Sequence, residues 1–263
     1  MGKIIAFTNQ KGGVGKTTSA VNVAASLGIL GKKVLLVDLD PQGSATSGVG
    51  VEKKSLAYSI RDLFRAFLSG EGEERTREIV NGCILTTKFE NLSLMPAVIT
   101  LSDTEFQLYK ADNSAFILKN ALHMISDRFD YLIIDCPPSL GMLTVNALTA
   151  CDGVIIPMQC EFYSLEGLSQ LIDSLHRCKK QYNPELQLAG ILITMYNGRL
   201  NLTLQVMDEL KRFYADKLFK TNVLRNVRLS EAPSYGCPII YYDANSKGAE
   251  AYRAVAKELA ERV

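Results

Sequence analysis

The chain has 263 residues, with 29 Lys and Arg against 28 Asp and Glu, and 47% of its residues are apolar. This composition is typical of a globular protein with a sizeable core. The net charge of +1 excludes a uniformly basic nucleic-acid binder of the histone kind but allows a local basic face.

Short apolar strands alternate with helices along the chain. We expect strands at 3–8, 33–38, 131–135, 153–157 and 188–194, and weaker ones at 83–87 and 92–97. We expect helices at 16–30, 104–128, 140–150, 165–182, 202–215 and 248–262, and a polar surface loop at 69–78 that runs into a short helix. Apolar strands separated by helices indicate a parallel sheet covered on both faces. This predicts an α/β fold with a single doubly wound, mostly parallel sheet, in one domain spanning residues 1–263.

The segment QKGGVGKTT, residues 10–18, follows the first expected strand and opens the first expected helix, which is the setting of a phosphate-binding P-loop. Its glycines let backbone N–H groups wrap around phosphates at the positive end of a helix dipole. Lys16 supplies a charge for the β- and γ-phosphates, and Thr17 supplies a hydroxyl for Mg²⁺. The expected ATP contacts are Lys11, Gly12, Gly13, Val14, Gly15, Lys16, Thr17 and Thr18.

Three carboxylates follow expected strands. Asp38 and Asp40 end the strand in VLLVDLD, and Asp135 ends the strand in YLIID. Parallel sheets place their ligand crevice at the carboxyl ends of the strands. Two residues apart on a strand, Asp38 and Asp40 are expected to point the same way, which suits one role near Mg²⁺ and one in positioning water.

The loop departs from the general P-loop pattern, because Gln10 stands at its first position and Lys11 is an additional lysine. It resembles the deviant Walker A motif of the ParA/MinD family of ATPases. The resemblance implies a sandwich dimer in which Lys11 reaches the partner's ATP and Gly12 lies where the two P-loops approach each other. It also implies that Asp40 orients the attacking water, that Asp38 supports the Mg²⁺ shell and that Asp135 holds Mg²⁺ through water. The catalytic residues would be Lys11, Lys16 and Asp40, and the metal site would comprise Thr17, Asp38 and Asp135.

Three long segments, at 40–50, 136–171 and 224–243, resemble ParA proteins of the short, Soj-like type. That type implies an ATP-dependent switch for chromosome or plasmid segregation, with ATP and Mg²⁺ as cofactors and a ParB/Spo0J-type partner that accelerates slow ATP hydrolysis. The ATP-bound homodimer would bind DNA nonspecifically. The loop containing Leu224 and Asn226 borders the adenine in these proteins, and Leu224 replaces a proline that is common there.

A basic excess lies between residues 199 and 228. This stretch holds seven Lys and Arg and three Asp and Glu, so its net charge is +4 and the rest of the chain totals −3. Such an excess suits phosphate contacts that do not read base sequence. The Soj-like resemblance implies that Arg199 contributes to DNA binding, and Arg228 is a second candidate.

Alternative functions are a MinD-like membrane-positioning ATPase and a ParA-like ATPase that positions another cargo. MinD-like proteins end in a basic amphipathic helix, whereas the apolar positions of residues 249–263 are mostly alanine, so we expect this segment to pack on the core. No apolar run reaches the roughly 18 residues that span a bilayer, and the first ten residues lack a secretory signal pattern. We therefore expect a cytoplasmic, nucleoid-associated protein without a stable membrane anchor.

The six cysteines form no C-x-x-C pair, which disfavours a zinc or iron–sulfur site of that type. We expect them to be buried thiols.

Overall fold

A computed structural model describes residues 2–262, which contain one seven-stranded sheet with the strand order β3-β4-β2-β5-β1-β6-β7. The strands are β1 (Lys3–Phe7), β2 (Val34–Asp38), β3 (Leu85–Thr86), β4 (Leu92–Met95), β5 (Tyr131–Asp135), β6 (Gly153–Met158) and β7 (Gln187–Ile193). Neighbouring strands pair in parallel except β3, which pairs antiparallel with β4 at the edge. The predicted mostly parallel sheet is confirmed, including both weaker strands.

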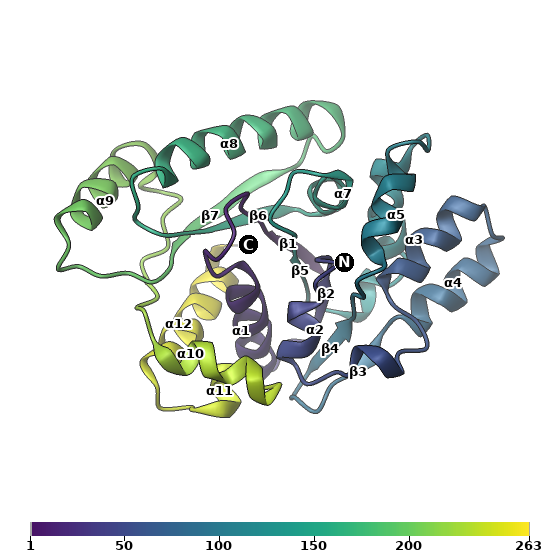
Figure 1. The fold of residues 1–263 in the computed structure, drawn as a ribbon, viewed down its shortest axis with the longest axis horizontal. Coiled ribbons are helices and arrows are strands. Elements are labelled where there is room, and N and C mark those ends of the chain that lie inside the picture. The colour runs from purple at the N-terminus through teal and green to yellow at the C-terminus, as the bar shows by residue number, and fades with distance from the viewer. Residues whose placement is uncertain (1, 263) are drawn as a thin grey trace.

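Helices cover the two faces of this sheet (Figure 1). They are α1 (Lys16–Ile29), α2 (Ser44–Gly48), α3 (Ile60–Ser69), α4 (Glu73–Gly82), α5 (Leu101–Leu108), α6 (Ile117–His123), α7 (Met142–Ala150), α8 (Ser164–Gln181), α9 (Asn201–Tyr214), α10 (Val227–Glu231), α11 (Ile239–Tyr242) and α12 (Lys247–Arg262). Successive residues of a strand point to opposite faces. Accordingly, Ile4 and Ala6 of β1 join a core cluster with α3 and α5 to α9, while Ile5 and Phe7 join a second cluster with α1 and α12. This confirms the doubly wound fold.

The expectation of one long helix at 104–128 is wrong. The chain instead forms α5, short 3₁₀ turns at Ser114–Phe116 and Ser126–Arg128, and α6. Asn113 has a φ of 55°, in the left-handed region, and the Ser114 hydroxyl donates a hydrogen bond to the carbonyl of Leu108 at 2.6 Å. Asn and Ser side chains compete with helical hydrogen bonds in this way, so the helix ends where these residues cluster.

Helix α3 was not predicted, whereas the predicted short helix after the polar loop is confirmed. A capping box begins α3: the Asp62 carboxylate accepts a hydrogen bond from the backbone N–H of Ser59 at 2.9 Å. Gly70 ends the helix with a φ of 67°, a conformation that glycine adopts without steric cost. The short helix after the loop is α4.

The last helix packs on the core, as predicted. Ala249, Tyr252, Val255, Ala256 and Leu259 of α12 are buried in the cluster that includes α1. Val263, the final residue of the segment considered above, lies outside the described residues. Within residues 2–262 no helix is both long and apolar enough to cross a membrane.

Four of the six cysteines are buried as expected: Cys83, Cys136, Cys151 and Cys178. Cys160 and Cys237 are only partly buried, so the expectation is wrong for these two. Cys160 follows β6 on the loop into α8, and Cys237 lies on the loop before α11. Both lie on loops that pack against the core clusters without being enclosed by them.

Candidate nucleotide-binding site

The central strands bring the P-loop and two of the predicted carboxylates to one edge of the sheet. β5 lies between β1 and β2, and Asp135 at its end pairs in register with Phe7 of β1 and with Asp38 of β2. The chain leaves β1 immediately before the P-loop, which occupies the turn into α1. Asp38 and Asp135 therefore lie side by side, next to the start of the P-loop.

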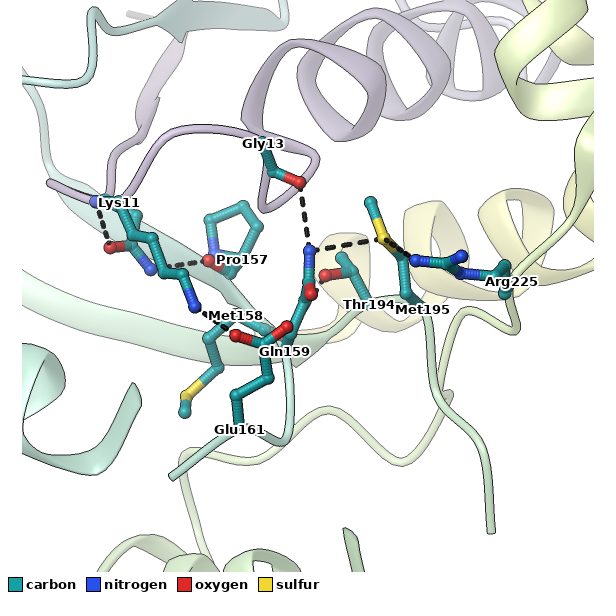
Figure 2. A network of polar contacts seen from close by, with 10 residues as sticks. Lys11, Gly13, Pro157, Met158, Gln159, Glu161, Thr194, Met195 and Arg225 are labelled. Carbon is teal, nitrogen blue, oxygen red and sulfur yellow. Dashed lines mark hydrogen bonds and ion pairs between the residues drawn. The ribbon is translucent and has the colours of Figure 1, made fainter. Parts of the chain in front are cut away.

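The P-loop backbone is held by residues that follow β6 and end β7 (Figure 2). The Gln159 side-chain amide donates to the carbonyl of Gly13 at 3.0 Å, and the Thr194 hydroxyl donates to the carbonyl of Val14 at 2.7 Å. Gly13 and Gly15 have φ values of 72° and 85°, which side chains with a Cβ rarely adopt. Because side chains from other segments hold the carbonyls of Gly13 and Val14, the conformation of the loop is fixed in the absence of a ligand.

Lys16 is the first residue of α1 and is 7% exposed. Its Nζ donates a hydrogen bond to the carbonyl of Lys11 at 3.0 Å, which folds the side chain back across the loop. Burial lowers the pKa of Lys16, and this effect outweighs the opposing attraction of Asp135 and Asp40. An anion bound inside the loop would restore the stability of the charged form, so this site favours a phosphate ligand.

Asp135 is fully buried, and neither of its carboxylate oxygens has a hydrogen-bond partner among the described residues. Burial, followed by the neighbouring Asp38, raises the pKa of Asp135 well above its ordinary value; nearby Thr17 and Lys16 oppose this only partly. Buried charges require a partner or a metal. A cation that prefers oxygen ligands, held near Asp135 and Thr17, would compensate the charge of this carboxylate. The residues present therefore fit Mg²⁺.

Asp38 is also fully buried but has its partners within the chain. One of its oxygens accepts hydrogen bonds from the Thr46 hydroxyl at 2.6 Å and from the Thr46 backbone N–H at 2.7 Å. Burial raises the pKa of Asp38 to about 6, although Thr46 acts in the opposite direction. The same Thr46 hydroxyl accepts a hydrogen bond from the backbone of Ala97 at 3.0 Å. Asp38 thus fastens α2 to the strand ends, in addition to lying beside Asp135.

Asp40 does not share the strand with Asp38, contrary to the expectation that both point the same way from β2. The strand ends at Asp38, and Asp40 begins a turn in which its carboxylate accepts a hydrogen bond from Gln42 N–H at 2.9 Å. The same turn is closed by a hydrogen bond from Gly43 N–H to the Asp40 carbonyl at 2.8 Å. The half-buried Asp40 therefore lies beyond the end of the strand, where its backbone N–H donates a hydrogen bond to the carboxylate of the fully buried Asp38 at 3.3 Å.

Lys11 is exposed and forms an ion pair with Glu161, on the loop between β6 and α8 (Figure 2). The Lys11 backbone N–H donates to the Asn9 side chain at 3.0 Å, and Asn9 in turn donates to the carbonyl of Pro157 at 2.8 Å. Gly12, the next residue, has no atoms within 4 Å of the position that a Cβ would occupy. Lys11 and Gly12 therefore lie on an open face of the P-loop.

A cavity of about 420 Å³ adjoins the P-loop at Gly15 and Thr18. The cavity is lined by Leu224 and Asn226, the two residues that were predicted to border the adenine, together with Met195, Pro233 and Tyr252. The side-chain oxygen Oδ1 of Asn226 accepts a hydrogen bond from the Arg228 backbone N–H at 2.8 Å, which leaves the side-chain N–H₂ group available to a ligand. This cavity has mainly apolar walls with a few polar groups, which suits a nucleotide base.

The two predicted DNA contacts differ in their surroundings. Arg199 is exposed on the loop before α9, and in the described part of the chain its guanidinium has no ion-pair or hydrogen-bond partner. The Arg228 guanidinium forms ion pairs with Glu231 at 2.9 Å and with Asp243 at 3.5 Å. Arg228 therefore has part of its guanidinium engaged by carboxylates, whereas Arg199 is available as it stands.

Sequence reasoning missed several residues that shape the site, namely Thr46, Gln159, Glu161, Thr194 and Met195. Glu161 lies 150 residues from Lys11, and Thr194 lies 180 residues from Val14. No spacing rule connects positions so far apart in a single sequence. Only Thr46 carried a signal, since it lies in the helix directly after the Asp38 strand.

Comparisons with known proteins identify the family. Residues 2–188 match the AAA domain family. The sporulation initiation inhibitor protein Soj of Bacillus subtilis is 51% identical over 260 residues, covering 99% of both chains. The chain belongs to the ParA/Soj family of partitioning ATPases.

Solved structures share the fold of this chain. Cobyrinic acid a,c-diamide synthase of Mycobacterium smegmatis, solved with bound ADP and magnesium and with a bound ATP analogue and magnesium, is 34% identical with a TM-score of 0.82; the match covers 99% of this chain and 95% of that one. The cell division ATPase MinD of Pyrococcus furiosus covers both chains completely with a TM-score of 0.79, but at 24% identity it shows the shared fold alone. The chain is thus a P-loop ATPase that is more similar to Soj than to this MinD structure.

Proposed function

We propose that the whole chain, residues 1–263, is a single ATPase domain that acts as an ATP-dependent switch in chromosome or plasmid segregation. In this account, ATP joins two copies into a sandwich dimer, the dimer binds DNA nonspecifically at the nucleoid, and hydrolysis releases it. The observation that carries the proposal is the convergence of the P-loop lysines with Asp38, Asp40 and Asp135 at one sheet edge. The family and the ligands of the M. smegmatis neighbour support ATP and Mg²⁺ as cofactors.

ATP is expected to bind along the whole P-loop, through Lys11 to Thr18. Lys16 would exchange its hydrogen bond to the Lys11 carbonyl for phosphate oxygens, and the base would enter the cavity lined by Leu224 and Asn226. Thr17 would hold Mg²⁺ directly, while Asp135, supported by Asp38, would hold it through water. When bound, Mg²⁺ supplies positive charge to the phosphate oxygens and withdraws electron density from the bond that breaks. Mg²⁺ usually keeps several waters and needs few protein ligands, which matches a site with one free carboxylate.

Hydrolysis is expected to depend on Asp40, Lys11 and Lys16. The half-buried Asp40 carboxylate would accept a hydrogen bond from the attacking water and align it with the γ-phosphate. Lys16 would stabilise the charge that develops on the phosphate oxygens, and the partner copy's lysine at position 11 would add a second positive charge. Histidine, the commonest general base, is absent from the named site, which is consistent with slow turnover until a ParB-type partner intervenes.

The Lys11–Glu161 ion pair gives Lys11 a competing position within its own chain. Both side chains are substantially exposed, and surface ion pairs stabilise by about 0.2–1 kcal/mol. Such a weak pair is readily exchanged for the partner's phosphates, since charge-assisted contacts to phosphate are stronger. Lys11 can therefore leave Glu161 when two copies meet.

Substituting Gly12 tests the sandwich dimer, because nothing in the single chain opposes a side chain there. We expect Gly12→Val to bind ATP within about threefold of wild type but to remain a monomer, as a single clash at the contact is enough to cancel an association. Size-exclusion chromatography with light scattering, with ATP present, measures this. Gly72→Val is the matched control, since Gly72 also has nothing within 4 Å of its Cβ position. An ATP-dependent Gly12→Val dimer would contradict this geometry.

Substituting Arg199 tests the DNA face. We expect Arg199→Glu to lose ATP-dependent DNA binding at moderate salt and to reduce the salt slope by about two, one phosphate contact from each copy. Arg228→Glu should have a smaller effect, because Arg228 is already paired with two carboxylates. Arg65→Glu, an exposed position on α3 at the other side of the molecule (Figure 1), serves as the control. Equal DNA retention by Arg199→Glu and Arg65→Glu would exclude this face.

The MinD-like alternative requires an apolar surface for a membrane, whereas the apolar residues of α12 are buried against α1. We expect the ATP-bound protein to remain in the supernatant when vesicles of anionic lipid are sedimented.

We expect a ParB-type partner to increase the hydrolysis rate, most simply by supplying an arginine to the phosphates.

A further inference from the structure

The turn that carries Asp40 is held from outside by a lysine that the proposed function does not use. The Lys53 ammonium, on the 3₁₀ turn Lys53–Ser55, donates a hydrogen bond to the carbonyl of Gln42 at 2.5 Å. Lys53 is half-buried, whereas its neighbour Lys54 is exposed and has no partner among the described residues. The contact joins the segment after α2 to the segment before it.

Hydrogen bonds connect Lys53 to the turn that carries the Asp40 carboxylate. Lys53 fixes the Gln42 carbonyl, the Gln42 N–H donates to the Asp40 carboxylate at 2.9 Å, and the Gly43 N–H donates to the Asp40 carbonyl at 2.8 Å. The last two bonds lie within the turn, so they move with it. In the described chain, the Lys53 ammonium is the one side-chain donor from another segment that holds the peptide between Gln42 and Gly43.

Close packing supports this contact. Gly43 has a φ of 63°, and a Cβ added there would lie 2.9 Å from the Lys53 ammonium and 3.0 Å from the Ala97 carbonyl. The lysine side chain therefore lies directly against the glycine that ends the turn. The segment beyond the turn is fixed independently, because Thr46 of α2 is bonded to the buried Asp38.

We infer that Lys53 is a positioning residue for ATP hydrolysis, which sets the orientation of the Asp40 carboxylate through the Gln42 peptide. This inference rests on the proposed role of Asp40 in orienting water. A catalytic carboxylate on a short turn is not held in place by a strand or a helix. Small displacements of such a group reduce the reaction rate by large factors. A charged donor on the adjacent carbonyl is a strong restraint at the surface.

The test compares Lys53→Met, which keeps the stem and removes the donor, with Lys53→Arg and with the control Lys54→Met. For Lys53→Met we expect kcat for ATP hydrolysis to fall about tenfold while KM stays within about twofold, since the residue acts on alignment rather than on binding. Lys53→Arg should recover most of the rate, because its guanidinium can donate to the same carbonyl. Lys54→Met should match wild type. An unchanged kcat in Lys53→Met would overturn the inference, and so would a tenfold rise in its KM, which would make Lys53 a phosphate contact instead.

Combining Lys53→Met with Asp40→Asn separates this inference from the proposed function. If Lys53 acts through Asp40, adding Lys53→Met to Asp40→Asn should lower the residual rate by less than about twofold. A further tenfold loss in the double variant would show that Lys53 acts elsewhere and would overturn the inference. If Asp40→Asn alone hydrolyses ATP at the wild-type rate, the role proposed for Asp40 fails, and the inference about Lys53 fails with it. Full activity of Lys53→Met beside an inactive Asp40→Asn would remove the inference alone.

Discussion

Asp40→Ala is expected to bind ATP, to form the dimer and to hydrolyse ATP about 100-fold more slowly than wild type, as the loss of a water-orienting group typically costs this much. The variant should therefore accumulate as a stable ATP-bound dimer. The reason is that the Asp40 carboxylate lies on a turn outside the P-loop, and its one hydrogen bond among the described residues comes from Gln42 of the same turn, so its removal leaves the binding groups in place. Single-turnover hydrolysis and light scattering on the same sample measure both effects.

Asp112→Ala is the matched control for this variant, because Asp112 is exposed on the loop between α5 and α6. A wild-type hydrolysis rate in Asp40→Ala would remove Asp40 from the mechanism. Loss of ATP binding in Asp40→Ala would also contradict the account, since it would mean that Asp40 holds the nucleotide or its cation.

Lys16→Ala is expected to weaken ATP binding by about 100-fold or more, because charge-assisted contacts contribute about 1.5–3 kcal/mol each and Lys16 serves two phosphates. Dimerisation, DNA binding and hydrolysis should be lost with it. Without nucleotide, the variant should be at least as stable as wild type, since burial already lowers the pKa of Lys16 and so disfavours its charge. Isothermal titration with an ATP analogue and thermal unfolding without ligand provide the two measurements.

Lys32→Ala, an exposed lysine just after α1, is the control for Lys16→Ala. ATP affinity within about threefold of wild type in Lys16→Ala would contradict the assignment of this loop as the phosphate site. A large loss of stability without ligand would instead show that Lys16 is a structural residue.

Local patterns in the sequence were sufficient to predict much of this protein. The P-loop could be read directly because its glycines, Lys16 and Thr17 are contiguous and their chemistry depends on that order. The central strands could be predicted because both of their faces are buried, which makes each one a continuous apolar run. The break at Asn113 was not predicted, although Asp112, Asn113 and Ser114 form a cluster of turn-favouring residues there.

Contacts between distant segments account for what the sequence did not reveal in the site. The ion pair of Lys11 with Glu161 and the hydrogen bond of Thr194 to the P-loop join segments that follow different strands. The pairing of Arg228 with Asp243 likewise depends on how α10 meets the segment before α12, whereas its pair with Glu231 lies within α10. The basic excess at 199–228 was therefore visible from composition, but the availability of each arginine was not.

The central claim is that ATP creates the DNA-binding form by pairing two copies of the chain. Co-sedimentation with nonspecific DNA at moderate salt tests it most directly, using wild type with ATP, wild type with ADP, and Gly12→Val with ATP. The account predicts that wild type with ATP sediments with DNA and that the other two samples stay largely in solution. Equal sedimentation with ADP and ATP, or wild-type binding by monomeric Gly12→Val, would contradict it.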